Sequence, residues 1–341
     1  MNGRLIKTWL SLIVILSLTA VLTGGCSLDP FAIPSVEEGN SGQNMIVVGI
    51  SQLGSESVWR SANTVSIQQA ISKEKGFFPI FSNARQKQEN QIKAIRGFIS
   101  QRVDYIVFAP VVEKGWDTIL SEAKEAGIPV IVMDRKVSVK DDSLYTALVG
   151  TDKEEEGKKA GRWLDEEMIR RGESNQNINI VVLQGTKGSS AALGRTKGFH
   201  IIAAEHPNWH ILDEMDGDFT TSRGKEVMQM LLRRYPNIDV VIAQNDDMAF
   251  GAVEAMNEAG ITTGPNGDVI LISFDAVYSA LEMVRDGIIN ADVECNPLQG
   301  EYVASIIHKL EAGEPIEKIN MVDGMIFSQD NVEDYLNTRV Y

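Results

Sequence analysis

Short apolar runs alternate with amphipathic stretches along the chain from residue 45 onward. Each run is rich in β-branched residues and has the length of a buried strand. The runs predict strands at 45–51, 77–83, 104–110, 129–135 and 144–150, and a second series at 178–185, 210–219, 239–246, 269–275 and 289–296. The intervening stretches show helical periodicity, and several end at glycine, as at 89–101, 116–127, 224–236 and 249–260.

This alternation indicates parallel sheets covered by helices, because strands that are apolar along their whole length need cover on both faces. Two series of strands predict two Rossmann-like, doubly wound α/β lobes rather than one large sheet. In open α/β sheets, ligands bind beyond the carboxyl ends of the strands. The loops at those ends are rich in hydrogen-bonding side chains here. We therefore expect a binding cleft where the two lobes face each other.

The start of the chain departs from this pattern. Arg4 and Lys7 precede an apolar run at 9–22, which is short for a membrane span and is followed by LTGGCS. Small residues before a single cysteine are typical of a lipoprotein signal. We therefore predict a signal peptide at 1–25 and a lipid on Cys26, which would hold the protein at the outer face of the cell membrane.

One position in this signal is unusual, because Thr23 stands where such signals commonly carry leucine. A plain signal peptide or a short anchor is the alternative. Residues 26–44 are rich in Pro, Gly, Ser and acidic residues, and they are expected to form a flexible tether.

Composition excludes several classes of function. The formal net charge of −15 argues against a nucleic-acid partner, because phosphate binding needs a basic face. The histidines show no metal spacing, and the glycine-rich LQGTKGSSAALGR lacks the order of a phosphate loop, so no metal and no cofactor are expected. The only other cysteine, Cys295, is expected to be a buried, inert thiol.

GSESVWR, which follows the first predicted strand, contains Glu56, Trp59 and Arg60. Tryptophan offers a flat apolar face and arginine a rigid fork of donors. A sugar has the matching halves, a face of C–H groups and a rim of hydroxyls. The alternative is a helix N-cap whose tryptophan turns into the core.

Other strand ends carry similar chemistry. Asp134 and Arg135 in MDRK can accept from and donate to neighbouring hydroxyls, although a surface ion pair is the alternative. QNDD and SFDA, at equivalent positions, favour binding. Phe219 in GDFTTS is expected to be a second aromatic wall or a core residue, and Lys87 a donor at the cleft mouth or a solvated helix start. The predicted ligand-binding residues are Glu56, Trp59, Arg60, Lys87, Asp134, Arg135, Arg195, Phe219, Asn245 and Asp275. The charged segment 151–160 is expected to be an exposed helix start.

Taken together, these loops resemble the ribose/galactose family of periplasmic sugar-binding proteins, the substrate-binding parts of ABC importers, and its galactofuranose-binding members in particular. The resemblance covers 45–341 and rests on motifs that include VGISQLGSESVWRSAN, IPVIVMDR, LQGTKGSSAALGRTKGF, AQNDDMAFGAVEAMNEAG and ADVECNP. It implies a type I periplasmic binding protein fold with a three-strand hinge, crossing near 149–150, 295–296 and 322–325. The lobes would then be 45–149 with 296–322, and 150–295 with 323–341.

The resemblance also implies a function. The lobes of a monomer would close on a monosaccharide and deliver it to an ABC permease, without catalysis. Ribose-type members have a glutamine where this chain has Cys295, which argues against ribose. GSESVWR and QKQENQ favour a hexose in furanose form, such as galactofuranose.

Three other functions share parts of this pattern. An enzyme could use Asp134, Asp275 and Glu294 as acids or bases, but no nucleophile–base pair is evident. A DNA-binding repressor can have the same lobes, but an export signal stands where its DNA-binding helices would be. A sugar-sensing lipoprotein that presents its bound state to a membrane sensor kinase stays open.

Overall fold

The computed structural model describes residues 45–341. The predicted signal peptide, Cys26 and the tether lie outside the described residues. The described part contains two six-stranded sheets, with strand orders β11-β5-β4-β3-β1-β2 and β12-β10-β9-β8-β6-β7. No helix in this part of the chain combines the length and apolar character that a membrane crossing requires.

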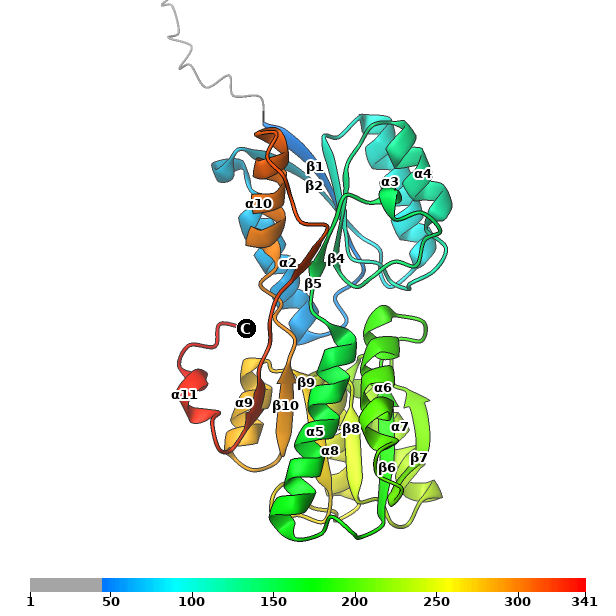
Figure 1. The fold of residues 1–341 in the computed structure, drawn as a ribbon, viewed down its shortest axis with the longest axis vertical. Helices are drawn as coiled ribbons and strands as arrows, with labels where there is room; N and C mark the ends of the chain where they lie inside the picture. The colour runs from blue at the N-terminus through cyan, green and yellow to red at the C-terminus, as the bar shows by residue number, and fades with distance from the viewer. Residues whose placement is uncertain (1–44) are drawn as a thin grey trace, which may run out of the picture. The chain divides into compact units, whose positions relative to one another are not determined.

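The first lobe is built on the first sheet. Its strands are β1 (Ile46–Gln52), β2 (Phe77–Asn83), β3 (Tyr105–Phe108), β4 (Val130–Asp134), β5 (Ala147–Gly150) and β11 (Ile319–Met321). Its helices are α2 (Val58–Ala70), α3 (Gln88–Gln101), α4 (Asp117–Glu125) and α10 (Gly300–Glu311), with 3-10 turns at Lys73–Lys75 and Asp142–Leu144. Helices α2 and α10 cover one face of the sheet and α3 and α4 the other (Figure 1), and an apolar cluster fills each interface.

The second lobe repeats this arrangement. Its strands are β6 (Ile178–Gln184), β7 (Trp209–Asp216), β8 (Val240–Ala243), β9 (Ile270–Asp275), β10 (Ala291–Glu294) and β12 (Ile326–Ser328). Its helices are α5 (Lys153–Arg171), α6 (Ser190–Ala203), α7 (Thr221–Arg234), α8 (Asp246–Glu258), α9 (Tyr278–Arg285) and α11 (Glu333–Leu336). One apolar cluster packs α5 and α6 on the sheet, and a second packs α7, α8 and α9 on its other face.

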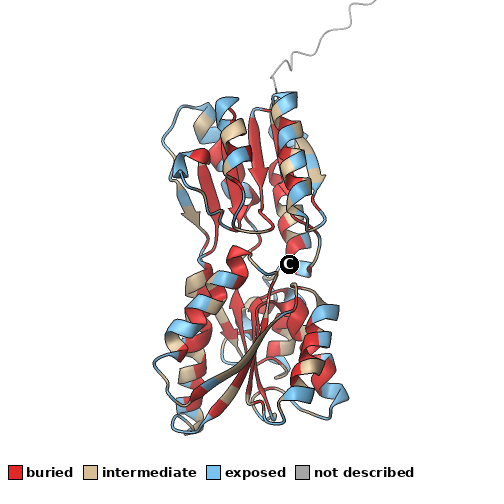
Figure 2. Cartoon of the chain, turned by 90° about the vertical axis from the view of Figure 1, so that its right-hand side faces the viewer, coloured by how far each residue is buried: buried red, intermediate tan, exposed pale blue. Residues whose placement is uncertain are grey.

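The burial of the central strands explains why the sequence pattern predicts them. The strands β3, β4, β5, β8, β9 and β10 are buried along their whole length, whereas the edge strand β2 is only partly buried. Figure 2 shows the same contrast between buried strands and the exposed outer sides of the helices. The prediction of two α/β lobes on parallel sheets is confirmed. One pair departs from it, because β10 and β12 run antiparallel, and β12 is too short to give a strand pattern.

The chain passes between the two sheets three times. β5 leads into α5, β10 leads into α10, and β11 leads into β12. After β10 the chain returns to the first lobe, where it forms α10 and β11. It then crosses to the second lobe, where it adds β12. The lobe boundaries given above remain a prediction about which residues move together.

Candidate functional site

One cavity is enclosed by side chains of both lobes. Its volume is about 20 Å³, room for about one water molecule, so a ligand the size of a sugar needs the lobes or the lining side chains to move apart. Nine of the ten predicted ligand-binding residues line it: Glu56, Trp59, Arg60, Asp134, Arg135, Arg195, Phe219, Asn245 and Asp275. The other lining residues are Ser57, Lys153, Ala191 and Cys295.

Lys87 is the predicted residue that the structure leaves outside this cavity. It is exposed and immediately precedes α3, where its side chain makes no capping hydrogen bond. The alternative of a solvated helix start describes its position. A ligand role for Lys87 stays an untested prediction.

Helix caps fix several of the lining segments. The side chain of Ser57 accepts a hydrogen bond from Arg60 N at the start of α2. Asn245 does the same at the start of α8, where its Oδ1 accepts from Met248 N. The Asn245 amide also donates to Phe219 O at 3.2 Å. Asn245 therefore lines the cavity but uses most of its hydrogen bonds to hold the second lobe's own backbone.

Backbone strain marks three of the lining residues. Asp134, Phe219 and Asp275 have φ angles of 64°, 57° and 112°. Such values cost on the order of 1–3 kcal/mol for residues with side chains and concentrate at binding sites. The strained backbone at the ends of β4 and β9 turns both carboxyl groups toward the cavity.

In the first lobe, the fork of Arg60 is already occupied. Its Nη2 donates to Asp134 Oδ2 at 2.6 Å and its Nε to Glu56 Oε1 at 3.0 Å. Burial would raise the pKa of Asp134, but the neighbouring charges of Arg60, Lys153 and Arg135 hold it well below its usual range. Two of the donors of Arg60 therefore hold carboxylates, and its Nη1 also donates to Asn63 Oδ1 at 3.3 Å.

In the second lobe, Arg195 plays the equivalent part. Its Nε donates to Glu156 Oε2 at 2.8 Å and its Nη2 to Asp275 Oδ1 at 3.0 Å. Burial raises the pKa of Asp275 to about 7, although Arg195 opposes this shift. Both lobes therefore present a buried arginine that orients acidic side chains at the cavity wall.

Lys153 and Glu156 correct the prediction that 151–160 is an exposed helix start. Both are buried. Lys153 Nζ lies 3.3 Å from Asp134 Oδ1 and 2.8 Å from Cys295 Sγ, so it joins the two lobes. Asp152 does cap α5, as the acidic helix start suggested. Because the segment is rich in charged residues, its sequence does not indicate that one of its faces is buried.

Cys295 is buried, as predicted, and burial raises the pKa of its thiol to about 12. Its backbone oxygen accepts from the Trp59 indole N–H. The Trp59 ring therefore spans the lobes and packs into the apolar cluster that includes Phe219. Trp59 and Phe219 are both core residues and cavity walls, so for each residue the two alternatives do not exclude each other.

Two buried polar atoms of the cavity residues make no hydrogen bond among the described residues, although Arg135 Nε lies 3.7 Å from Asp134 Oδ2. They are Glu56 Oε2, an acceptor, and Arg135 Nε, a donor. The two side chains are only 2% and 4% exposed. An unsatisfied buried polar group costs roughly 1–3 kcal/mol, so a polar ligand that meets both would be favoured. Across the cavity, the Arg135 guanidinium lies 5.1 Å from the centre of the Phe219 ring.

No group of three or more His, Cys, Asp or Glu side chains within 45–341 is placed to hold a metal ion. The side chains that line the cavity supply hydrogen bonds, buried ion pairs and aromatic faces.

Comparison with known proteins identifies the family. Residues 48–315 match the periplasmic binding protein domain. The chain belongs to this family. It is 39% identical to the galactofuranose-binding protein YtfQ of Escherichia coli, over 86% of this chain and 91% of that protein. The resemblance inferred from the loops is thereby confirmed.

Solved structures agree with this assignment. A Mycobacterium smegmatis protein in complex with beta-D-fucofuranose is 42% identical, with a TM-score of 0.82 over 86% of this chain and 94% of that one. The fructose-binding periplasmic domain of the hybrid two-component system BT1754 is 25% identical, with a TM-score of 0.77 over 86% and 94% of the two chains. These relatives are sugar-binding proteins.

Proposed function

We propose that the protein captures a neutral monosaccharide, a hexose in furanose form such as galactofuranose, between its lobes and delivers it to an ABC importer. The two buried atoms without a hydrogen bond, Glu56 Oε2 and Arg135 Nε, carry this proposal. A sugar hydroxyl both donates and accepts, so neighbouring hydroxyls would satisfy both atoms. The Trp59 and Phe219 faces supply apolar contact for the C–H groups.

A neutral ligand fits the charge of the cavity. The lining cations Arg60, Arg135, Arg195 and Lys153 face two sets of carboxyl groups: those of Glu56, Asp134 and Asp275 in the lining, and that of Glu156, which lies behind the lining and pairs with Arg195 and Lys153. The cations and the carboxyl groups are equal in number, and most of them are already paired. A sugar acid or a sugar phosphate would add a charge that lacks a free partner there.

Binding would work through closure. An open form admits the sugar, and the closed form is favoured because only there do both lobes contact it. The closed form then docks on the permease, and the sugar leaves chemically unchanged. A lipid on Cys26 would keep the protein at the outer face of the membrane, beside that partner.

Isothermal titration with methyl β-D-galactofuranoside, an arabinofuranoside, fructose and ribose tests this function. We expect the galactofuranoside to bind more tightly than ribose. Glu56→Gln should weaken its binding by about 10- to 100-fold, because hydrogen bonds to charged groups contribute roughly 1.5–3 kcal/mol. Glu125→Gln, an exposed change of the same type in α4, is the matched control and should bind normally. Absence of furanoside binding, or normal binding by Glu56→Gln, would contradict the proposal.

A second role has one specific observation in its favour, the similarity to the periplasmic domain of a two-component system. In this role the closed, sugar-bound form is read by a membrane sensor kinase. The genes beside this one distinguish the two roles. A permease and an ATPase indicate import, and a sensor kinase indicates signalling.

A further inference from the structure

Asp247 lies where the two lobes meet, beside the cavity but outside its lining. It stands in the first turn of α8, two residues after Asn245. Its Oδ2 accepts a hydrogen bond from Val58 N at 3.1 Å. Val58 is the first residue of α2, which also carries Trp59 and Arg60. One hydrogen bond thus joins the helix starts that supply lining residues from opposite lobes.

Asp247 is buried without a cation. It is 8% exposed, and no ion pair of the described residues includes it. The groups that face it are the Val58 N–H from α2, the Thr221 hydroxyl of α7 at 3.5 Å, and the carboxylate of Glu56 before α2. The two donors are neutral, and the charged neighbour has the same sign. Burying an ionised carboxylate at this position is therefore unfavourable.

We propose that Asp247 is a proton-sensitive latch between the lobes, a positioning residue that sets sugar affinity without touching the sugar. When the lobes separate, Asp247 returns to water and loses the Val58 N–H. When they close, a protonated Asp247 still accepts from Val58 N–H and carries no charge into the seam. When Asp247 is ionised, closure buries its negative charge next to that of Glu56. Closure therefore takes up a proton.

The sign of the pH effect follows from this cycle. Burial, with the Glu56 charge adding to it, raises the pKa of Asp247 to about 6 in the closed form. In the open form an exposed aspartate has a pKa of about 3.9. Between these values the closed form binds the proton more strongly. Sugar should therefore bind about tenfold more tightly at pH 5 than at pH 8 through this group.

Titration of methyl β-D-galactofuranoside from pH 5 to pH 8 tests the latch, which rests on the proposed function for its ligand. Asp247→Asn keeps an acceptor for Val58 N–H and has no charge. It should bind about tenfold more tightly than the unchanged protein at pH 8, and its ratio of affinities at pH 5 and pH 8 should be about tenfold smaller, while Asp275 in the cavity wall keeps its own contribution to the pH dependence. Asp247→Ala removes the acceptor and should bind more weakly than Asp247→Asn at every pH.

Glu254→Gln, an exposed change on the same helix, is the matched control and should keep the normal pH profile. The latch is wrong if Asp247→Asn has the affinity and pH slope of the unchanged protein.

X-ray scattering of the sugar-free protein reports closure without any ligand. We expect its radius of gyration to fall from pH 8 to pH 5, and to fall less in Asp247→Asn. If the radius of gyration changes with pH as expected but no furanoside binds at any pH, the ligand assignment is wrong and the latch is not. A radius that is independent of pH in the unchanged protein would overturn the latch.

Discussion

Individual residues of the cavity differ in how far the sequence reveals their roles. Trp59 and Arg60 stand out because a tryptophan and an arginine stand side by side in the short segment that follows a buried strand. The partner of Arg60 could not be predicted, because Asp134 lies 74 residues further along the chain. Lys153 was missed because a charge-rich helix start is normally solvated, and only the packing of two lobes buries it.

A glycine next to the cavity offers a sharp test of the Phe219 wall. A Cβ at Gly185 would lie 1.8 Å from Cζ of the Phe219 ring. Gly185→Ala should displace the ring and weaken sugar binding about tenfold, since overpacking costs roughly 1–3 kcal/mol. Calorimetric titration measures the change.

Gly97→Ala is the matched control, because the new Cβ would meet only the end of Gln101, at 3.9 Å. It lies within α3 and should leave binding unchanged while slightly favouring the helix. Equal affinities of the two variants would show that Phe219 does not form a wall of the ligand site.

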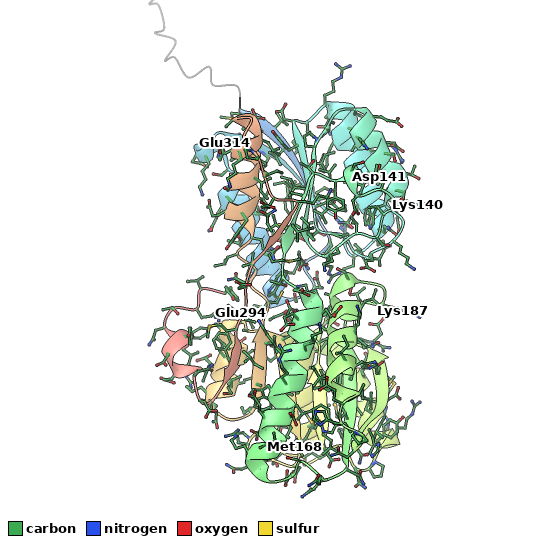
Figure 3. The ribbon with its side chains drawn as sticks, in the orientation of Figure 1. Lys140, Asp141, Met168, Lys187, Glu294 and Glu314 are labelled. Atoms are coloured by element: carbon green, nitrogen blue, oxygen red, sulfur yellow. The ribbon has the colours of Figure 1, made fainter. Side chains whose placement is uncertain are left out.

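At the scale of elements, the sequence predicted the central strands and the helices well because each has a strong period. The last segment of the chain has no such period, and its packing on β10 was not predicted. Glu294, labelled in Figure 3, ends β10 and accepts from Arg339 Nη1 at 2.6 Å and from the Tyr341 hydroxyl at 2.8 Å. Its other oxygen accepts from Met325 N at 3.0 Å. Glu294 thus links the last segment to two of the three crossings between the lobes.

Arg339→Ala should lower the free energy of unfolding by about 2–3 kcal/mol, because it leaves the carboxylate of Glu294 largely buried without its cation. The side chains of Arg339 and Glu294 are only 7% and 11% exposed. Arg285→Ala removes an exposed ion pair with Asp286 and should leave the urea midpoint almost unchanged. Urea unfolding monitored by circular dichroism compares the two. Similar midpoints would mean that the Glu294 contacts contribute little.

For the molecule as a whole, buried acids are expected to make stability depend on pH. Asp246 and Asp292 are fully buried next to each other in the second lobe. Burial raises the pKa of Asp292 to about 7 and also raises that of Asp246, whose neighbouring carboxyl adds to the shift. The folded protein therefore keeps a proton that the unfolded chain, with an aspartate pKa of about 3.9, releases.

Because the folded state holds more protons between about pH 4 and pH 7, the free energy of unfolding should fall as the pH rises through this window. Asp292→Asn keeps the oxygen that accepts from Ala276 N and removes one charge, so it should lose much of this dependence. Urea unfolding at pH 5 and pH 8 measures it, with the exposed Asp330→Asn as control. An unchanged dependence in Asp292→Asn would contradict the assignment.

The central claim is that a furanose sugar occupies this cavity and that the lobes close over it. Cys295 reports both, because its buried thiol lines the cavity and Cys26→Ser leaves it the only cysteine. We would measure the rate at which a small maleimide labels Cys295 in the folded Cys26→Ser protein, with and without saturating methyl β-D-galactofuranoside. The account predicts slow labelling through the open form and at least about a tenfold lower rate with sugar, when the open form is depleted. An unchanged rate with the sugar bound, or no labelling at all without it, would contradict the account.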